Sequence, residues 1–174
     1  MTIRKIARMG HPVLLQKAAP VADVAAVQDL IRDMHDTLVD SGGIGLAAPQ
    51  VHESQRVILV SVPDQRREGE EPAVQITALI NPELEPVGEE KVTGWEGCLS
   101  IPGLRGAVPR WTAVKFRALN IQGQPIEGEA RGMMARVLQH EVDHLDGILY
   151  TMRMDDLSKI GFDEEISRYA LSNG

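Results

Sequence analysis

The chain has 174 residues, of which 43% are hydrophobic and 25% charged, a balance typical of one globular domain. Its 18 basic and 25 acidic side chains give a net charge of -7, which argues against a protein that binds DNA through its phosphates. The single cysteine, Cys98, excludes an intrachain disulfide, and no apolar run reaches the length of a membrane span or signal peptide. These features predict one domain over residues 1–174, located in the cytoplasm and bound neither to DNA nor to a membrane.

Helices are predicted in the first quarter of the chain. After an extended start, Pro12 in the segment HPVLLQ suits the first turn of a short helix. Over residues 24–39 the apolar side chains recur every three or four positions, which predicts an amphipathic helix. Ser41 and two glycines after it end that pattern.

Short strands are predicted in the middle of the chain, and helices near its end. Strands are expected over residues 56–62, 74–81 and 113–120, and the charged segment 63–72 is expected to be a solvated surface loop. Helices are expected over residues 132–145 and 163–171. Because helices and strands do not alternate regularly, the sequence predicts an α+β fold with antiparallel strands rather than parallel βαβ units.

The segment HEVDH at residues 140–144 carries the clearest chemical pattern. On a helix, His140 and His144 lie one turn apart on the same face and can bind one metal ion, with Glu141 beside it. This pattern is typical of metal-dependent hydrolases. Met133 and Val137 continue the same face, so they are candidates either for the wall of an apolar pocket beside the metal or for core packing.

A catalytic metal site of this kind usually has three protein ligands and an open position for water. The metzincin pattern is excluded because Tyr150 stands where that family has its third histidine. Cys98, in the string EGCLSIPG, is the favoured third ligand because a thiolate is a strong soft ligand. Glu164, downstream of the second histidine, is the alternative and would complete a thermolysin-like site.

The glycine-rich string GIGLAAPQ at residues 43–50 partly mimics a dinucleotide-binding loop. It follows a predicted helix instead of a strand, and Pro49 prevents the helix on which a pyrophosphate would rest, so a Rossmann fold is excluded. What remains is either a simple turn or a loop whose backbone can approach a ligand closely. In the second case Gln50, at its end, could donate a hydrogen bond from its side-chain amide.

Together, GIGLAAPQ (43–50), EGCLS (96–100) and QHEVDH (139–144) resemble the three signature motifs of the peptide deformylases, in the same order and at similar spacing. The resemblance extends from RKIARMGHPVLL near the N-terminus through IPGLRGAVPR to DGILY, and so covers most of the chain. It implies an α+β fold in which antiparallel strands surround a central helix bearing HExxH. It also implies an enzyme that removes the formyl group from the N-terminal formyl-methionine of newly made polypeptides and releases formate.

The resemblance implies that Cys98, His140 and His144 bind the metal and leave a fourth position for water. Glu141 would take the proton from that water and later deliver it to the departing amine. By softness and number these ligands suit zinc, iron or nickel. The family points to Fe(II) in the cell, with Zn(II) or Ni(II) as substitutes.

Roles around the metal follow from the same resemblance. The side-chain amide of Gln50 and the backbone N–H of Leu99 would donate hydrogen bonds to the oxygen of the tetrahedral intermediate. Apart from the resemblance, ligating histidines and their helix usually need polar support, so Asp143 is expected either to support the histidine helix with Arg110 as its partner or to be a carboxylate on the helix surface. The residues expected to contact the substrate are Ile44, Gly45, Glu96, Met133 and Val137.

The expected partners are N-formylmethionyl nascent peptides. Some members of the family end in a strongly basic helix that docks on ribosomal RNA, whereas the tail of this chain, MRMDDLSKIGFDEEISRYALSNG, is mixed to acidic. Because neutralising phosphate requires clustered Lys or Arg, the tail argues against a ribosome contact.

Two other functions compete with deformylation. A small metallopeptidase would use Glu164 as its third ligand, and a non-catalytic domain would bind a metal without turning anything over. The presence of Glu141 and Gln50 argues against the non-catalytic domain, since neither residue is needed to hold an ion.

Overall fold

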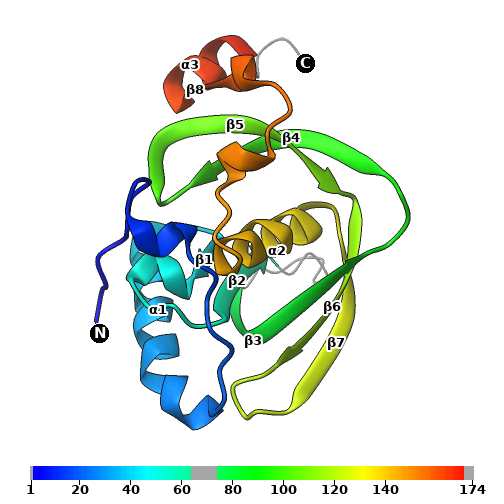
Figure 1. Ribbon diagram of the computed structural model, residues 1–174. Coiled ribbons are helices and arrows are strands. Elements are labelled where there is room, and N and C mark those ends of the chain that lie inside the picture. The colour runs from blue at the N-terminus through cyan, green and yellow to red at the C-terminus, as the bar shows by residue number, and fades with distance from the viewer. Residues whose placement is uncertain (1, 64–73, 171–174) are drawn as a thin grey trace.

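The computed structural model describes residues 2–63 and 74–170, and its strands form two antiparallel sheets (Figure 1). The five-stranded sheet has the order β1 (Gly45–Ala47), β2 (Val57–Pro63), β3 (Val74–Pro86), β6 (Ala113–Leu119) and β7 (Pro125–Arg131). The three-stranded sheet has the order β4 (Lys91–Cys98), β5 (Ile101–Trp111) and β8 (Ile160–Phe162). All neighbouring strands are antiparallel, so the predicted α+β fold is confirmed.

Helix α1 (Gln28–Ser41) confirms the amphipathic pattern but begins later than predicted. Residues Val24–Val27 form a 3-10 helix, whose first turn is capped by the side chain of Asp23. Gly42 ends α1 in the left-handed conformation, with φ 63°, which suits a residue without a Cβ. The apolar face of α1 packs on β1 and β2 and helps form a core beside the GIGLAAPQ segment.

Helix α2 (Gly132–Leu145) has the predicted bounds and carries the HEVDH segment. One face of the helix buries Ala135, Leu138 and Leu145 against the five-stranded sheet. Contacts with β5 tie the same helix to the three-stranded sheet. Strands of both sheets therefore surround the helix that carries the histidines (Figure 1).

Strands β4 and β5 were not predicted, because their sequences are interrupted by glycine and proline. They form a long antiparallel pair whose register shifts between Gly97 and Cys98. Gly106 in β5 is required by packing, since a Cβ there would lie 2.6 Å from the sulfur of Met154 and 2.9 Å from the ring of Tyr150. The predicted strands at 56–62, 74–81 and 113–120 are present with shifted ends.

The C-terminal segment differs from the predicted helix over residues 163–171. Within its described residues, 163–170, only α3 (Asp163–Glu165) is α-helical, and a π-helical turn follows over Ile166–Ala170. Strand β8 precedes α3 and pairs with β5, so this segment is anchored through a sheet edge. The short helix expected near the N-terminus is a 3-10 helix over Pro12–Leu15.

The expected surface loop and the expected absence of a membrane span concern other parts of the chain. The loop expected over residues 63–72 lies outside the described residues, apart from its first position at the end of β2. Within the described ranges, no helix has the length and apolar character that crossing a membrane would require.

Candidate metal centre and active site

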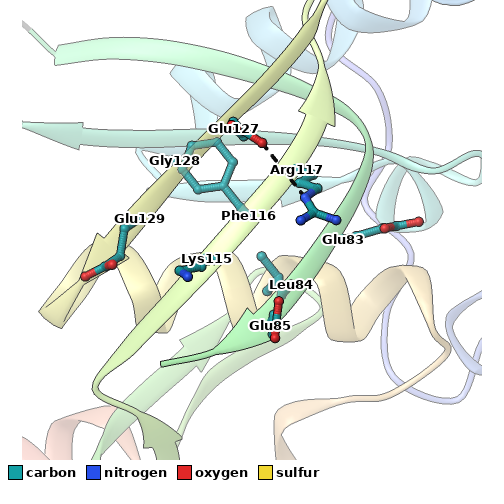
Figure 2. Close-up of a pocket in the computed structure, with 9 residues that line it drawn as sticks. All are labelled: Glu83, Leu84, Glu85, Lys115, Phe116, Arg117, Glu127, Gly128 and Glu129. Carbon is teal, nitrogen blue, oxygen red and sulfur yellow. Dashed lines mark ion pairs between the residues drawn. The ribbon is translucent and has the colours of Figure 1, made fainter. Parts of the chain in front are cut away.

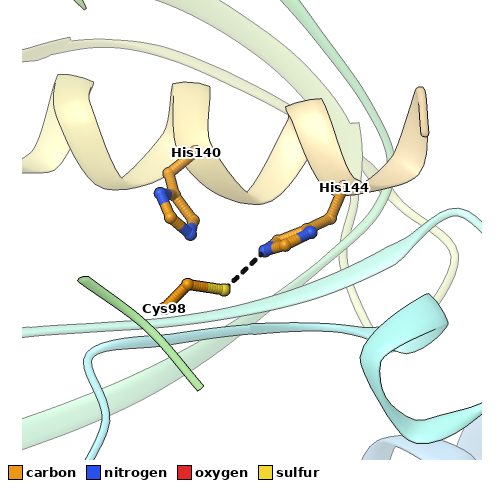
Figure 3. Close-up of side chains that lie close together, drawn as sticks. All are labelled: Cys98, His140 and His144. Carbon is orange, nitrogen blue, oxygen red and sulfur yellow. Dashed lines mark hydrogen bonds between the residues drawn. The ribbon is translucent and has the colours of Figure 1, made fainter. Parts of the chain in front are cut away.

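The side chains of Cys98, His140 and His144 converge between β4 and α2 (Figure 3). Their potential ligand atoms all lie within 4.8 Å of one another, and the sulfur of Cys98 is 3.3 Å from Nε2 of His144. Both histidines are buried, whereas Cys98 is partly exposed to a groove. One thiolate and two imidazoles form a donor set that fits a borderline-soft divalent ion such as zinc or iron.

Glu164 does not join this group. It is exposed on α3, and the only cluster of three potential metal ligands found among residues 2–63 and 74–170 is the one with Cys98. The thermolysin-like arrangement therefore has no geometric basis in this structure.

Glu96 on β4 lies in the wall of the groove, and its carboxylate is hydrogen-bonded to His140 and to two arginines. One oxygen lies 2.8 Å from Nδ1 of His140, so the other ring nitrogen is the one left for a metal. Arg110 donates two hydrogen bonds to the same carboxylate, and Arg136 donates a third over 2.8 Å. Such a contact fixes both the tautomer and the orientation of a ligating imidazole.

The pKa values around His140 reflect these contacts. Burial alone would raise the pKa of Glu96, but hydrogen bonds with His140 and Arg110 outweigh it and lower that pKa to about 2. Burial likewise disfavours the charged form of His140, yet hydrogen bonds with Cys98 and Glu96 raise its pKa to about 10. Burial holds the pKa of His144 well below its ordinary value. A metal ion bound here must displace the proton that His140 carries in its absence.

Glu141 is buried beside the histidines, and burial raises its pKa to about 7. Its Oε2 atom has no hydrogen-bond partner among the described residues. Gly45 in β1 makes room for this side chain, since a Cβ there would overlap the Glu141 carboxylate. A buried carboxylate that has an unpartnered oxygen and lies beside three potential metal ligands is suited to accepting a proton.

Gln50 lies directly beside the cysteine. Its Oε1 accepts a hydrogen bond from the backbone of Ala47 over 2.8 Å, which orients the amide. Its Nε2 then faces Ser100 Oγ at 3.1 Å and the sulfur of Cys98 at 3.5 Å. The backbone N–H of Ser100 also donates to that sulfur, and Leu99 stands between these residues in the groove wall. The amide is thus fixed where it can donate to an oxygen next to the metal centre.

The predicted substrate-contacting residues line one groove. Ile44 and Met133 are half-exposed on its walls, and Gly45 lines it next to the Glu141 side chain. Val137 is buried; it borders the groove and also belongs to the core beneath α2, so both interpretations of this residue apply. An apolar wall next to three convergent polar ligands is a common form of small-ligand site.

The expected pairing of Asp143 with Arg110 is confirmed, at 2.5 Å with both side chains buried. Arg153 also binds Asp143, over 2.7 Å. Sequence reasoning missed Arg136, although it lies one helical turn before His140 and so could have been found from its spacing. A Cβ at Gly94 would lie 2.9 Å from its guanidinium, which shows how tightly β4 approaches it.

Comparison with known proteins places this site in a family. The sequence matches the Polypeptide deformylase family over residues 3–160. The chain belongs to the peptide deformylase family. Deformylases are metal-dependent hydrolases, and membership implies removal of an N-terminal formyl group.

Individual deformylases resemble this chain along nearly its whole length. Peptide deformylase 1 of Bordetella pertussis is 46% identical over 164 residues, which are 93% of each chain. Peptide deformylase 1 of Nitrosomonas europaea is 43% identical over 166 residues, 94% of each chain. Among solved structures, the Met-Ala-Ser-bound class I type b deformylase of Acinetobacter baumannii has a TM-score of 0.79 at 39% identity, covering 88% of this chain and 99% of that one. The Thermotoga maritima deformylase has a TM-score of 0.81 at 34% identity, covering 90% and 100%.

Proposed function

We propose that this protein, as a single catalytic domain in the cytoplasm, removes the formyl group from N-formylmethionyl nascent peptides. The observation that carries the proposal is the convergence of Cys98, His140 and His144 beside a buried Glu141, in the lining of a partly apolar groove. A metal-dependent hydrolase needs a metal, a base and a place for the substrate, and this groove offers a candidate for each.

Cys98, His140 and His144 would hold the metal, which we propose to be Fe(II) in the cell, with Zn(II) or Ni(II) as substitutes. When bound, a divalent ion supplies Lewis-acid activation of water and of the formyl carbonyl. Glu96 supports the set by holding Nδ1 of His140, which makes it a positioning residue.

The remaining steps belong to the chain's own residues. Glu141 accepts a proton from the attacking water, and the water oxygen bonds to the formyl carbon. The amide of Gln50 and the backbone N–H of Leu99 donate hydrogen bonds to the carbonyl oxygen as it gains negative charge. The carbon–nitrogen bond then breaks, Glu141 returns the proton to the departing amine, and formate leaves.

Recognition of methionine is assigned to the apolar part of the groove. Ile44, Met133 and Val137 would contact the methionine side chain, because all three border the groove near the ligands. Gly45 would present its backbone to the substrate. The absence of a side chain at that position also keeps the space that Glu141 occupies.

The C-terminal segment gives no support to a ribosome contact. Its basic side chains lie next to carboxylates: Arg153 binds Asp143, Lys159 lies 3.8 Å from Asp156, and Arg168 lies 3.7 Å from a glutamate on α3. No cluster of cations is therefore left for phosphate in the described part of this segment, residues 152–170. We propose that the nascent peptide is the relevant partner.

Release of formate from formyl-Met-Ala-Ser by protein prepared without oxygen tests the proposed function. The peptide is chosen because the similar Acinetobacter baumannii deformylase was solved with Met-Ala-Ser bound, which is this peptide without its formyl group. We expect steady turnover, loss of both metal and activity in Cys98→Ala, and retention of both in Glu164→Ala. Metal-replete protein that releases no formate, or a Glu164→Ala variant that loses its metal, would contradict the proposal.

A further inference from the structure

The three potential metal ligands lie on two elements, Cys98 on β4 and the two histidines on α2. Binding one ion requires a fixed separation of strand and helix, because ligand bonds of about 2.0–2.3 Å tolerate little displacement. Apart from Glu96 and the ligands themselves, Arg136 makes all the hydrogen bonds recorded between α2 and β4 within residues 2–63 and 74–170. This arginine is therefore the main polar link between the two elements outside the site.

The guanidinium of Arg136 reaches two strands at once. Its Nη1 donates to the Glu96 carboxylate over 2.8 Å and to the backbone oxygen of Val108 on β5 over 2.9 Å. Its Nη2 donates to the backbone oxygen of Val92 on β4 over 2.6 Å. The side chain is 14% exposed, so most of it lies away from water, where such bonds are stronger. The planar fork of a guanidinium suits these three acceptors, which a single ammonium nitrogen would not reach together.

Glu96 connects Arg136 to the metal ligands. His140 follows Arg136 by one helical turn, so both side chains leave the same face of α2. They meet the two oxygens of one carboxylate, since Arg136 donates to Oε1 of Glu96 and Nδ1 of His140 lies 2.8 Å from Oε2. Two residues after Glu96, the same strand carries Cys98. Arg136 thus ties the strand that supplies the sulfur to the helical turn that supplies an imidazole.

Gly94 makes room for the guanidinium. It pairs with Val108 in the register of β4 and β5, and a Cβ at this position would lie 2.9 Å from Nη2 and 3.0 Å from Cζ of Arg136. An added methyl group would therefore push the guanidinium away from its acceptors. A substitution at Gly94 can displace the guanidinium while its charge stays in the protein.

We propose that Arg136 is a positioning residue that holds β4, with Cys98, at the distance from the histidines of α2 that metal binding requires. It acts through the strand and through Glu96, and its effect is tighter binding of the ion. This inference rests on the metal site of the proposed function, and its test measures the metal instead of deformylation.

The Kd for zinc, measured by competition between the metal-free protein and a chromogenic chelator, tests the proposal. Arg136→Met removes the donors and keeps an unbranched side chain, and we expect it to raise the Kd by about tenfold, the lower end for residues that support ligands. Gly94→Ala should raise the Kd as well. Adding Gly94→Ala to Arg136→Met should have no further effect, because the guanidinium with which the methyl group collides is gone and methionine is flexible.

The matched control is Arg117→Met. Arg117 lies 3.9 Å from Glu127 in a separate groove along β3, β6 and β7 (Figure 2), and its side chain is 75% exposed. This variant should keep the Kd of the unmodified protein. Cobalt-loaded protein gives a second measurement, since the thiolate-to-cobalt absorption band should weaken in Arg136→Met and Gly94→Ala. A residue that only stabilises the fold would lower Tm and leave the Kd and this band unchanged.

The outcomes separate this inference from the proposed function. An unchanged Kd and an unchanged cobalt band in Arg136→Met and Gly94→Ala, or an equal loss in Arg117→Met, would overturn the role of Arg136. Additive losses in the double variant would contradict the guanidinium as their shared cause. If Arg136→Met does not fold, Gly94→Ala decides alone. The expected shifts in protein that releases no formate would leave this inference standing and overturn deformylation, whereas zinc bound without sulfur would overturn both.

Discussion

Glu141 is buried and its pKa is raised, and the raised pKa should set the pH dependence of the reaction. A base must be deprotonated to accept a proton, and burial raises the pKa of this carboxyl group to about 7. Only the deprotonated fraction supports turnover, so activity is present above that pKa and falls as the pH drops through it.

We therefore expect kcat/KM to rise by about tenfold per pH unit below pH 7 and to level off above it. Glu141→Gln is the control: it should lose about a hundredfold or more in rate and show no inflection near pH 7 in what remains. A profile for the unmodified enzyme that is flat between about pH 6 and 8 would rule out Glu141 as the titrating base.

The sequence predicted contacts between site residues where those residues lie close together in the chain. The one-turn spacing of His140 and His144 predicted their shared face, and the unusual string around Cys98 marked the third donor. The contact between Glu96 and His140 joins residues 44 positions apart, so no local pattern could reveal it. Glu96 was expected to contact substrate. Its carboxylate is bound by His140 and two arginines, and because the residue also lines the groove, the substrate contact stays a prediction.

Among the elements, β1 and α2 approach each other so closely that a side chain at Gly45 would overlap Glu141, the proposed base. We expect Gly45→Ala to lower kcat by about tenfold or more, because the added methyl group must push the Glu141 carboxylate out of place. Metal content should be unchanged, since the ligands lie elsewhere. Retention of full kcat, measured with formate release, would contradict the close approach.

Helix α2 is also tied to β5 and β4 by buried charges. Arg110 bridges the carboxylates of Glu96 and Asp143, and all three side chains are buried. We expect Arg110→Met to cost about 3–5 kcal/mol in urea unfolding, because it leaves buried carboxylates short of a partner. Arg117→Met, in an exposed pair, should cost less than about 1 kcal/mol. Equal losses for the two variants would mean that the buried bridge is not stabilising.

Helices and strands whose apolar residues recur at a regular spacing were predicted, whereas strands interrupted by proline and glycine were not. Helix α2 appears with the predicted bounds, since its apolar stripe and its packing on the sheet agree. Strands β4 and β5 contain residues that disfavour strands, and they form because long-range pairing and packing against Tyr150 and Met154 outweigh local preference. The pairing of β8 with β5 spans too much chain for any local signal.

For the whole molecule, metal binding and folding should be linked. An ion that binds the folded state alone stabilises it by about 2.7 kcal/mol at a hundred times its Kd. Removing the metal with a chelator should therefore lower Tm by roughly 5–11 °C, and adding it back should restore the value.

Binding of the metal to the metal-free protein should also release protons. The raised pKa of His140, about 10, means that this imidazole is protonated at pH 7 without metal and must lose the proton to bind it. We expect at least one proton released per ion in weakly buffered solution at pH 7. Reloading without proton release would contradict the role of His140 as a ligand.

X-ray absorption at the zinc edge of zinc-loaded protein measures the metal's neighbours directly. One sulfur at about 2.3 Å together with nitrogen or oxygen neighbours at about 2.0–2.1 Å is expected if Cys98, His140 and His144 hold the ion with room left for water. A spectrum without sulfur would contradict the site on which deformylation by this protein depends.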